Sequence, residues 1–232
     1  MVQLYVLVFA SRLVSILFYD SYLPIDSSGD LLYRTMELSS FFLCLIILIV
    51  GYTIFKETYD STSDSFGNFL FLPSAIGILW IIIPAFCLAL VFHPSLNSNL
   101  ITDVLWTFAI TLESAAILPQ ITMLIKSLKA SGDRVSTVIQ PCISHILSSL
   151  GLSRLFLLVF WLASYTELND KFTLNAKITL SPVGVNVGNF VVLSQCVQLL
   201  IMCDFLYYYV KALYSGHDII EHLQNNWAMP PV

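Results

Sequence analysis

The sequence predicts an all-α integral membrane protein, and three observations support this fold class. Hydrophobic residues make up 57% of the 232 residues and charged residues only 11%, whereas about a quarter of an ordinary soluble domain is charged. The mean hydropathy is +0.83. Apolar runs that approach the roughly 20 residues a helix needs to cross a bilayer recur along the whole chain.

Six such runs predict six transmembrane helices, at residues 2–19, 38–55, 69–92, 101–125, 138–163 and 187–213. The first run has no basic segment before it, contains Arg12 and precedes no small-residue cleavage site, so we expect a retained helix rather than a cleaved signal peptide. Short polar loops separate most runs and favour a compact helical bundle. The longest polar break, residues 166–182, has alternating character at 171–180 and is compatible with a short hairpin.

The predicted organisation is one polytopic transmembrane domain, residues 1–213, followed by a cytosolic tail, residues 214–232. With both termini in the cytosol, the cytosolic loops carry more lysine and arginine than the lumenal loops, which agrees with the positive-inside rule. Three consecutive tyrosines, 207–209, follow Asp204 in the last run and are typical of an interfacial aromatic belt.

Several functional classes find no support in the sequence. The net charge of −5 offers no basic surface for nucleic acid, and the acids lie mainly in loops. The five cysteines and four histidines show no metal-ligand spacing, and no phosphate-binding loop or nucleophile elbow is present. We therefore expect no enzyme activity, no metal and no cofactor.

One carboxylate, Glu113, lies inside an otherwise uncharged apolar run. Because an ionised group in a bilayer is costly, such residues usually have a function or a charged partner. Helical spacing places Trp106, Glu113 and Gln120 at i, i+7 and i+14, as one polar and aromatic stripe on a single face. The sequence predicts that this stripe faces a wet or ion-paired pocket.

Two arginines, Arg12 and Arg154, also fall in the middle of apolar runs, and Trp161 shares a helix face with Arg154. One interpretation is an Arg–Glu pair that pins helices together. The other is a polar cavity for an anionic ligand, favoured because guanidinium binds carboxylates through two hydrogen bonds and because two arginines exceed the one glutamate.

Two further acids have open roles. Asp103, near the end of its predicted helix, either meets a basic group of a ligand or stabilises the helix N-terminus. Asp204, in the last run, is a surface acid, a helix-pinning group or part of a conformational switch.

Four stretches resemble the ER lumen protein-retaining receptors, or KDEL receptors, in order and spacing: ETYDSTSDSF (57–66), DVLWTFAITLESAAILPQ (103–120), SHILSSLGLSRLFLLVFW (144–161) and QLLIMCDFLYYYVKAL (198–213). The resemblance implies a seven-helix bundle related to the SWEET and PQ-loop transporters, with Pro119-Gln120 as the namesake dipeptide. The first run resembles the family's second helix, so we expect the family's first helix to be absent, together with its arginine and histidine.

The resemblance also implies site residues. Arg12 matches the arginine that receives the terminal carboxylate of the ligand, and Asp103 and Trp106 match residues that line the lumenal cavity. Glu113 and Arg154 match polar residues of the helix core, and Trp161 matches a tryptophan of the cavity. His145 and Asp204 are the candidates for a pH or conformational switch.

The chain departs from the family pattern at several pocket positions. Leu13 and Ser15 stand where the family has a tyrosine and an aspartate. Ser153, Phe160 and Ser164 replace a tyrosine, an asparagine and an arginine. The tail lacks the family's lysine pair. These changes bear on ligand choice, pH response and recycling.

The leading hypothesis is a multi-pass receptor of the ER and Golgi membranes that captures C-terminal KDEL- or HDEL-type tetrapeptides and returns lumenal proteins to the ER. The implied partners are that tetrapeptide, the vesicle coat machinery and the lipid bilayer. The family binds at acid pH and releases at neutral pH. Two alternatives are a PQ-loop-type carrier of a small solute and a degenerate receptor that acts as a trafficking partner.

Overall fold

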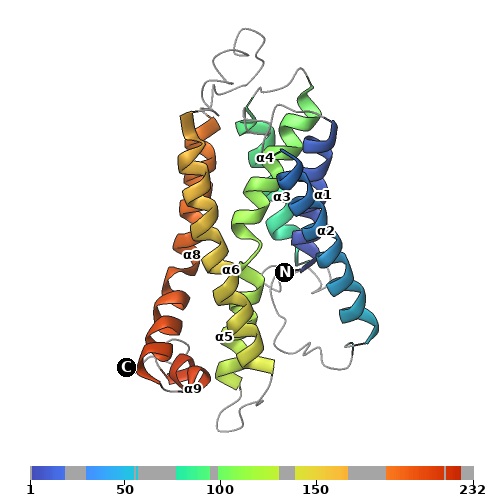
Figure 1. The fold of residues 1–232 in the computed structure, drawn as a ribbon. Helices are drawn as coiled ribbons and strands as arrows, with labels where there is room; N and C mark the ends of the chain where they lie inside the picture. The colour runs from blue at the N-terminus through green and yellow to red at the C-terminus, as the bar shows by residue number, and fades with distance from the viewer. Residues whose placement is uncertain are drawn as a thin grey trace. The chain divides into compact units, whose positions relative to one another are not determined.

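The structure is a computed structural model, and it describes residues 2–18, 30–54, 56, 77–94, 99–130, 139–166, 187–216 and 218–225. Within these residues the regular structure is helical throughout (Figure 1), which confirms the predicted all-α class. The helices are α1 (Val2–Phe18), α2 (Asp30–Thr53), α3 (Leu79–Phe92), α4 (Leu100–Ala115), α5 (Leu118–Ala130), α6 (Ile139–Ala163), α8 (Val187–Ser215) and α9 (Ile219–Leu223). The hairpin expected at 171–180 lies outside the described residues.

Four helical segments of the described chain are long and apolar enough to cross a membrane: Asp30–Thr53, Leu100–Lys129, Pro141–Ala163 and Val187–Ser215. Two further apolar helices, α1 and α3, are shorter. The predicted run at 69–92 begins outside the described residues, so α3 represents only its second part. The multi-pass membrane class is therefore supported by the helices that the structure describes.

The chain divides into two compact units. The first comprises Met1–Tyr59, Ile78–Ala116 and Phe160–Ser194, and the second comprises Asp60–Gly77, Ile117–Val159 and Gln195–Val232. The first unit therefore contains α1 to α4, and the second contains α5, most of α6 and α8, and α9.

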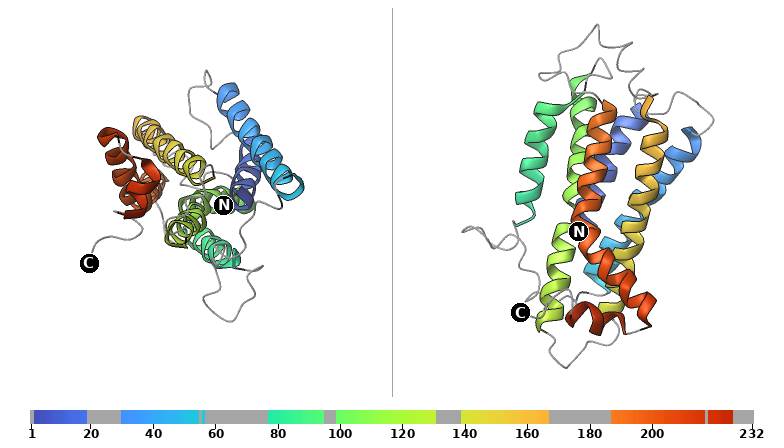
Figure 2. Two further views of the ribbon diagram at one scale, coloured as in Figure 1. Left: turned by 90° about the horizontal axis from the view of Figure 1, so that it is seen from below. Right: turned by 90° about the vertical axis from the view of Figure 1, so that its left-hand side faces the viewer.

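In the first unit, α1 packs against both α2 and α4, and α3 packs against α4. Both views in Figure 2 show α1, in dark blue, beside α2 and α4. The rings of Phe86 and Phe108 meet edge to face, with centroids 5.7 Å apart, and the Thr111 hydroxyl donates a hydrogen bond to the Ala85 carbonyl at 3.2 Å. Aromatic and polar contacts therefore join α3 to α4.

In the second unit, α6 approaches α8 closely at a glycine. A Cβ atom added at Gly151 would lie 2.9 Å from the terminal carbons of Leu206 and 3.1 Å from that of Met202. Six residues earlier in α6, Nδ1 of His145 lies 2.6 Å from the Tyr209 hydroxyl. Gly216, with a left-handed φ of 66°, follows the end of α8, as expected of a helix-terminating glycine.

The run predicted as one helix at 101–125 is two helices, with a turn at Ala116 and Ile117. Pro119 has no N–H to donate to the carbonyl four residues earlier, and its ring disfavours a continuous helix. Around the turn, the amide of Ala116 bonds the Glu113 carbonyl and the amide of Gln120 bonds the Ile117 carbonyl, both three residues back. The prediction that the stripe continues to Gln120 is therefore wrong, because the stripe ends with α4 and Gln120 lies in α5.

The second helix also differs from its prediction, because α2 begins at Asp30 and not at residue 38. Asp30 lies in the first turn of α2, where a negative charge stabilises the helix dipole. The polar residues that the hydropathy criterion assigned to a loop, Arg34 and Glu37 among them, are therefore helical.

Close packing at Gly151 gives the first testable prediction. Gly151→Leu should lower the free energy of unfolding by about 1–3 kcal/mol, because the new side chain collides with Leu206 and Met202. Gly51→Leu is the matched control, since no atom lies within 4 Å of a Cβ added at Gly51. Thermal unfolding in detergent measures both, and equal midpoints for the two variants would contradict the close contact.

Candidate ligand-binding site

The guanidinium of Arg12 in α1 is buried between two carboxylates. Nη1 of Arg12 lies 3.0 Å from Oε1 of Glu37 in α2, and Nη2 forms a second salt bridge with Oε2 of Glu113 in α4. The three residues are 7%, 8% and 2% exposed, respectively. One cation therefore joins three helices of the first unit.

A small polar residue near Arg12, Ser15, helps to place the Arg12 side chain close to α4. Ser15, one turn further along α1, is fully buried. Its hydroxyl lies 3.2 Å from the Ser11 carbonyl and 3.1 Å from the Thr102 carbonyl of α4. A small hydroxyl residue thus lets α1 come close to the first turn of α4 while its polar atom keeps hydrogen-bond partners. This contact holds the Arg12 face of α1 toward α4.

Sequence reasoning missed Glu37, and its presence changes the charge of the site. Two carboxylates share the Arg12 guanidinium, so this cluster has a formal net charge of −1, since 1 − 2 = −1. The predicted surplus of arginine over glutamate therefore does not hold. Glu37 lies one residue outside the apolar run 38–55, and extending the helix back to the N-terminal acid Asp30 would have found it.

The predicted cavity residues Asp103 and Trp106 both lie in α4, the helix that carries Glu113. They are 2% and 1% exposed. The Asn99 side chain caps this helix by accepting a hydrogen bond from the Ile101 amide at 3.0 Å. The structure thus brings Asp103, Trp106 and Glu113 together on one buried helix of the first unit.

Two further predicted site residues, Arg154 and Trp161, lie in α6; both are buried, but they belong to different units. Arg154, 6% exposed, belongs to the second unit, whereas Trp161, 8% exposed, belongs to the first. Trp161 makes an edge-to-face contact with Phe160, with ring centroids 5.1 Å apart. Burial at both positions agrees with the sequence analysis, while a shared pocket for Arg154 and Arg12 stays a prediction.

The two switch candidates, His145 and Asp204, lie in the second unit. The His145 ring contacts Tyr209 through the 2.6 Å hydrogen bond and an edge-to-face arrangement. Asp204 is exposed on α8. Tyr209 is only 8% exposed, so its assignment to an interfacial belt is wrong. Tyr207, 60% exposed, keeps that assignment as a prediction.

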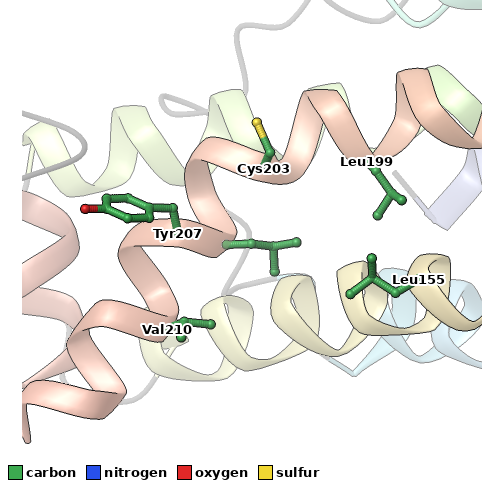
Figure 3. Close-up of a pocket in the computed structure, with 6 residues that line it drawn as sticks. Leu155, Leu199, Cys203, Tyr207 and Val210 are labelled. Atoms are coloured by element: carbon green, nitrogen blue, oxygen red, sulfur yellow. The ribbon is translucent and has the colours of Figure 1, made fainter.

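A groove of about 460 Å³ lies on the second unit between α6 and α8 (Figure 3). Its lining is apolar and contains Leu155, Leu199, Cys203, Leu206, Tyr207 and Val210. Lipid chains suit such a surface, whereas the charged groups of a peptide terminus do not, because none of the lining side chains carries a charge. Among the described residues no group of three His, Cys, Asp or Glu side chains is placed to hold a metal ion.

Together, the apolar helices and the buried ion pairs describe a multi-pass α-helical membrane protein whose first unit encloses the Arg12 cluster. The chain belongs to the ER lumen protein retaining receptor family, whose sequence model matches residues 1–164. This match confirms the resemblance noted in the sequence. The family is one of retention receptors, which also confirms the expectation of a receptor rather than an enzyme.

Similar proteins come from distant organisms. ER lumen protein-retaining receptor 2 of Gallus gallus is 31% identical over 209 residues, which cover 89% of this chain and 80% of that protein. ER lumen protein-retaining receptor 3 of Mus musculus is 28% identical over 208 residues, 89% of this chain and 79% of that protein. The receptor of Entamoeba histolytica is 26% identical over 198 residues, 82% and 75% of the two chains. No solved structure matches significantly.

The Arg12 cluster gives the second prediction. Arg12→Met should lower the free energy of unfolding by about 3–5 kcal/mol, because it leaves two carboxylates buried without their cation. The triple variant Arg12→Met, Glu37→Met, Glu113→Met should recover most of this loss, since apolar side chains of similar volume replace the whole cluster.

Yield and thermal unfolding in detergent measure this effect. Lys56→Met, at an exposed position, is the control for removing a positive charge. A triple variant less stable than Arg12→Met would contradict the ion-pair interpretation.

Proposed function

We propose that this chain is a receptor that binds the C-terminal KDEL- or HDEL-type signal of ER lumenal proteins and returns them from the Golgi to the ER. The observation that carries the proposal is the buried guanidinium of Arg12, held inside the membrane-embedded first unit of a member of the retention-receptor family. A guanidinium is the side chain best suited to bind a terminal carboxylate through two hydrogen bonds.

Capture in this proposal is non-covalent and uses charges at both ends of the peptide. Arg12 binds the terminal carboxylate, and Asp103, beside Trp106, meets the basic side chain four residues from the peptide end. Burial strengthens both interactions because water is excluded from Arg12 and Asp103, which are 7% and 2% exposed. Glu113, Arg154 and Trp161 complete the polar lining.

The proposed architecture is six spans of a seven-helix bundle related to the SWEET and PQ-loop transporters. The two shorter helices α1 and α3 would then be spans in addition to the four long ones. Residues 1–213 form the transmembrane domain, and residues 214–232, with α9, form the cytosolic tail that vesicle coat machinery would contact. Buried Ile220 and Leu223 show that α9 packs its apolar side against the second unit.

In the same proposal, His145 and Asp204 take part in the change between bound and released states. Both lie in the second unit, and His145 already has a hydrogen-bond partner on α8 in Tyr209. This contact joins α6 to α8, so a rearrangement at His145 would reach α8. The proposed membranes are those of the ER and the Golgi.

The test is binding of a labelled HDEL-ending peptide to the purified protein, at about pH 5.5 and about pH 7.4, with a C-terminally amidated peptide as control. The free-acid peptide should bind more tightly than the amide. Arg12→Lys should weaken its binding about tenfold or more, because lysine keeps the charge but has a single nitrogen in place of the two that hold a carboxylate each. Lys56→Arg is the matched control.

Equal binding of the acid and the amide would contradict the role of Arg12. Absence of binding by folded protein would favour the degenerate receptor, which acts as a partner of intact receptors or of the coat machinery. Solute uptake into proteoliposomes, without peptide binding, would favour the carrier.

A further inference from the structure

Glu37 binds the same guanidinium that the proposed function assigns to the ligand. Its Oε1 atom lies 3.0 Å from Nη1 of Arg12, while Glu113 binds Nη2. A ligand carboxylate binds a guanidinium through its N–H groups, and each terminal nitrogen of Arg12 already holds a carboxylate. Such a ligand therefore competes with a carboxylate that is already bound to Arg12.

The two acids are not held equally. Glu113 is 2% exposed and lies in α4, which packs against both α1 and α3. Glu37 lies in α2, which packs against α1 and exposes most of its apolar side chains. The second oxygen of Glu37, Oε2, is buried without a hydrogen-bond partner among the described residues. Glu37 is therefore the acid that leaves Arg12 more readily.

Charge supports the same conclusion. The Arg12–Glu37–Glu113 cluster has a formal net charge of −1, and a third carboxylate in this buried site would increase the repulsion. Tyr33, one turn before Glu37, interacts electrostatically with Glu37 and Arg12 and hydrogen-bonds the Glu37 side chain, but it contributes no positive charge. If the ligand carboxylate replaces Glu37, Arg12 still contacts two carboxylates. If the ligand carboxylate is simply added, three carboxylates surround one guanidinium.

We infer that Glu37 is a built-in competitor of the ligand carboxylate: its side chain occupies Arg12 in the free receptor and sets the affinity for the retention signal. This inference rests on the proposed function. It explains how a buried arginine stays paired before ligand arrives, and it assigns a specificity-determining role to a residue of α2.

The experiment compares wild type with Glu37→Gln, using HDEL-ending peptides with a free or an amidated C-terminus. Glutamine keeps the size of the side chain and removes its charge. The variant should bind the free-acid peptide roughly tenfold more tightly, within the range usual for coupled sites, with the affinity for the amide unchanged. Glu221→Gln, the same substitution at an exposed position of α9, should leave both affinities unchanged.

The outcomes separate the inference from the proposed function. If wild type binds the free acid selectively but Glu37→Gln binds it equally or more weakly, the competitor role is overturned and the receptor function stands. An equal gain for acid and amide also overturns that role, because the effect then does not arise at the carboxylate. If neither folded protein binds peptide, both ideas fail, whereas binding by Glu37→Gln alone supports both.

A second variant protects the experiment against misfolding. Glu37→Met has similar volume and no charge, so it should tighten binding of the free acid in the same direction. The two variants are compared at matched stability in detergent.

Discussion

The salt bridges of Arg12 are the interaction on which the first unit depends. A guanidinium in the apolar interior is tolerated only when carboxylates neutralise it and accept its hydrogen bonds. Glu37 and Glu113 supply this from two different helices, so α2 and α4 must both lie against α1. The Ser15 hydroxyl strengthens the α1–α4 contact through the Thr102 carbonyl.

The same interaction connects structure to function. An arginine that holds three helices together is already paired, so a carboxylate ligand binds it by replacing one of the two acids. The acid on α2 is the one with the weaker hold, because α2 exposes most of its apolar side chains whereas α4 packs against both α1 and α3. Ligand binding would then loosen the contact between α1 and α2 and give the receptor two arrangements that differ in the partners of one side chain.

Composition was sufficient to predict the all-α membrane class, and the cost of burying a charge predicted that Arg12, Glu113 and Arg154 are enclosed. Hydropathy does not predict the start of a helix that extends beyond its apolar run. Because α2 begins eight residues before the run at 38–55, the sequence analysis did not include Glu37 in the site. The turn after α4 had a visible signal in Pro119, but helical spacing was extended across it. The His145–Tyr209 pair joins residues 64 apart, and a single sequence carries no signal for such a contact. The receptor function was predicted from the resemblance to a family. A buried arginine alone is equally compatible with a salt bridge that pins helices together and with a site for an anionic ligand.

The most direct measurement is an experimental structure of the receptor with an HDEL-ending peptide bound. The account predicts that the peptide carboxylate contacts Nη1 of Arg12, that Glu113 stays on Nη2, and that Glu37 has left the guanidinium. A bound peptide whose carboxylate lies elsewhere, with Arg12 still paired to both Glu37 and Glu113, would contradict it.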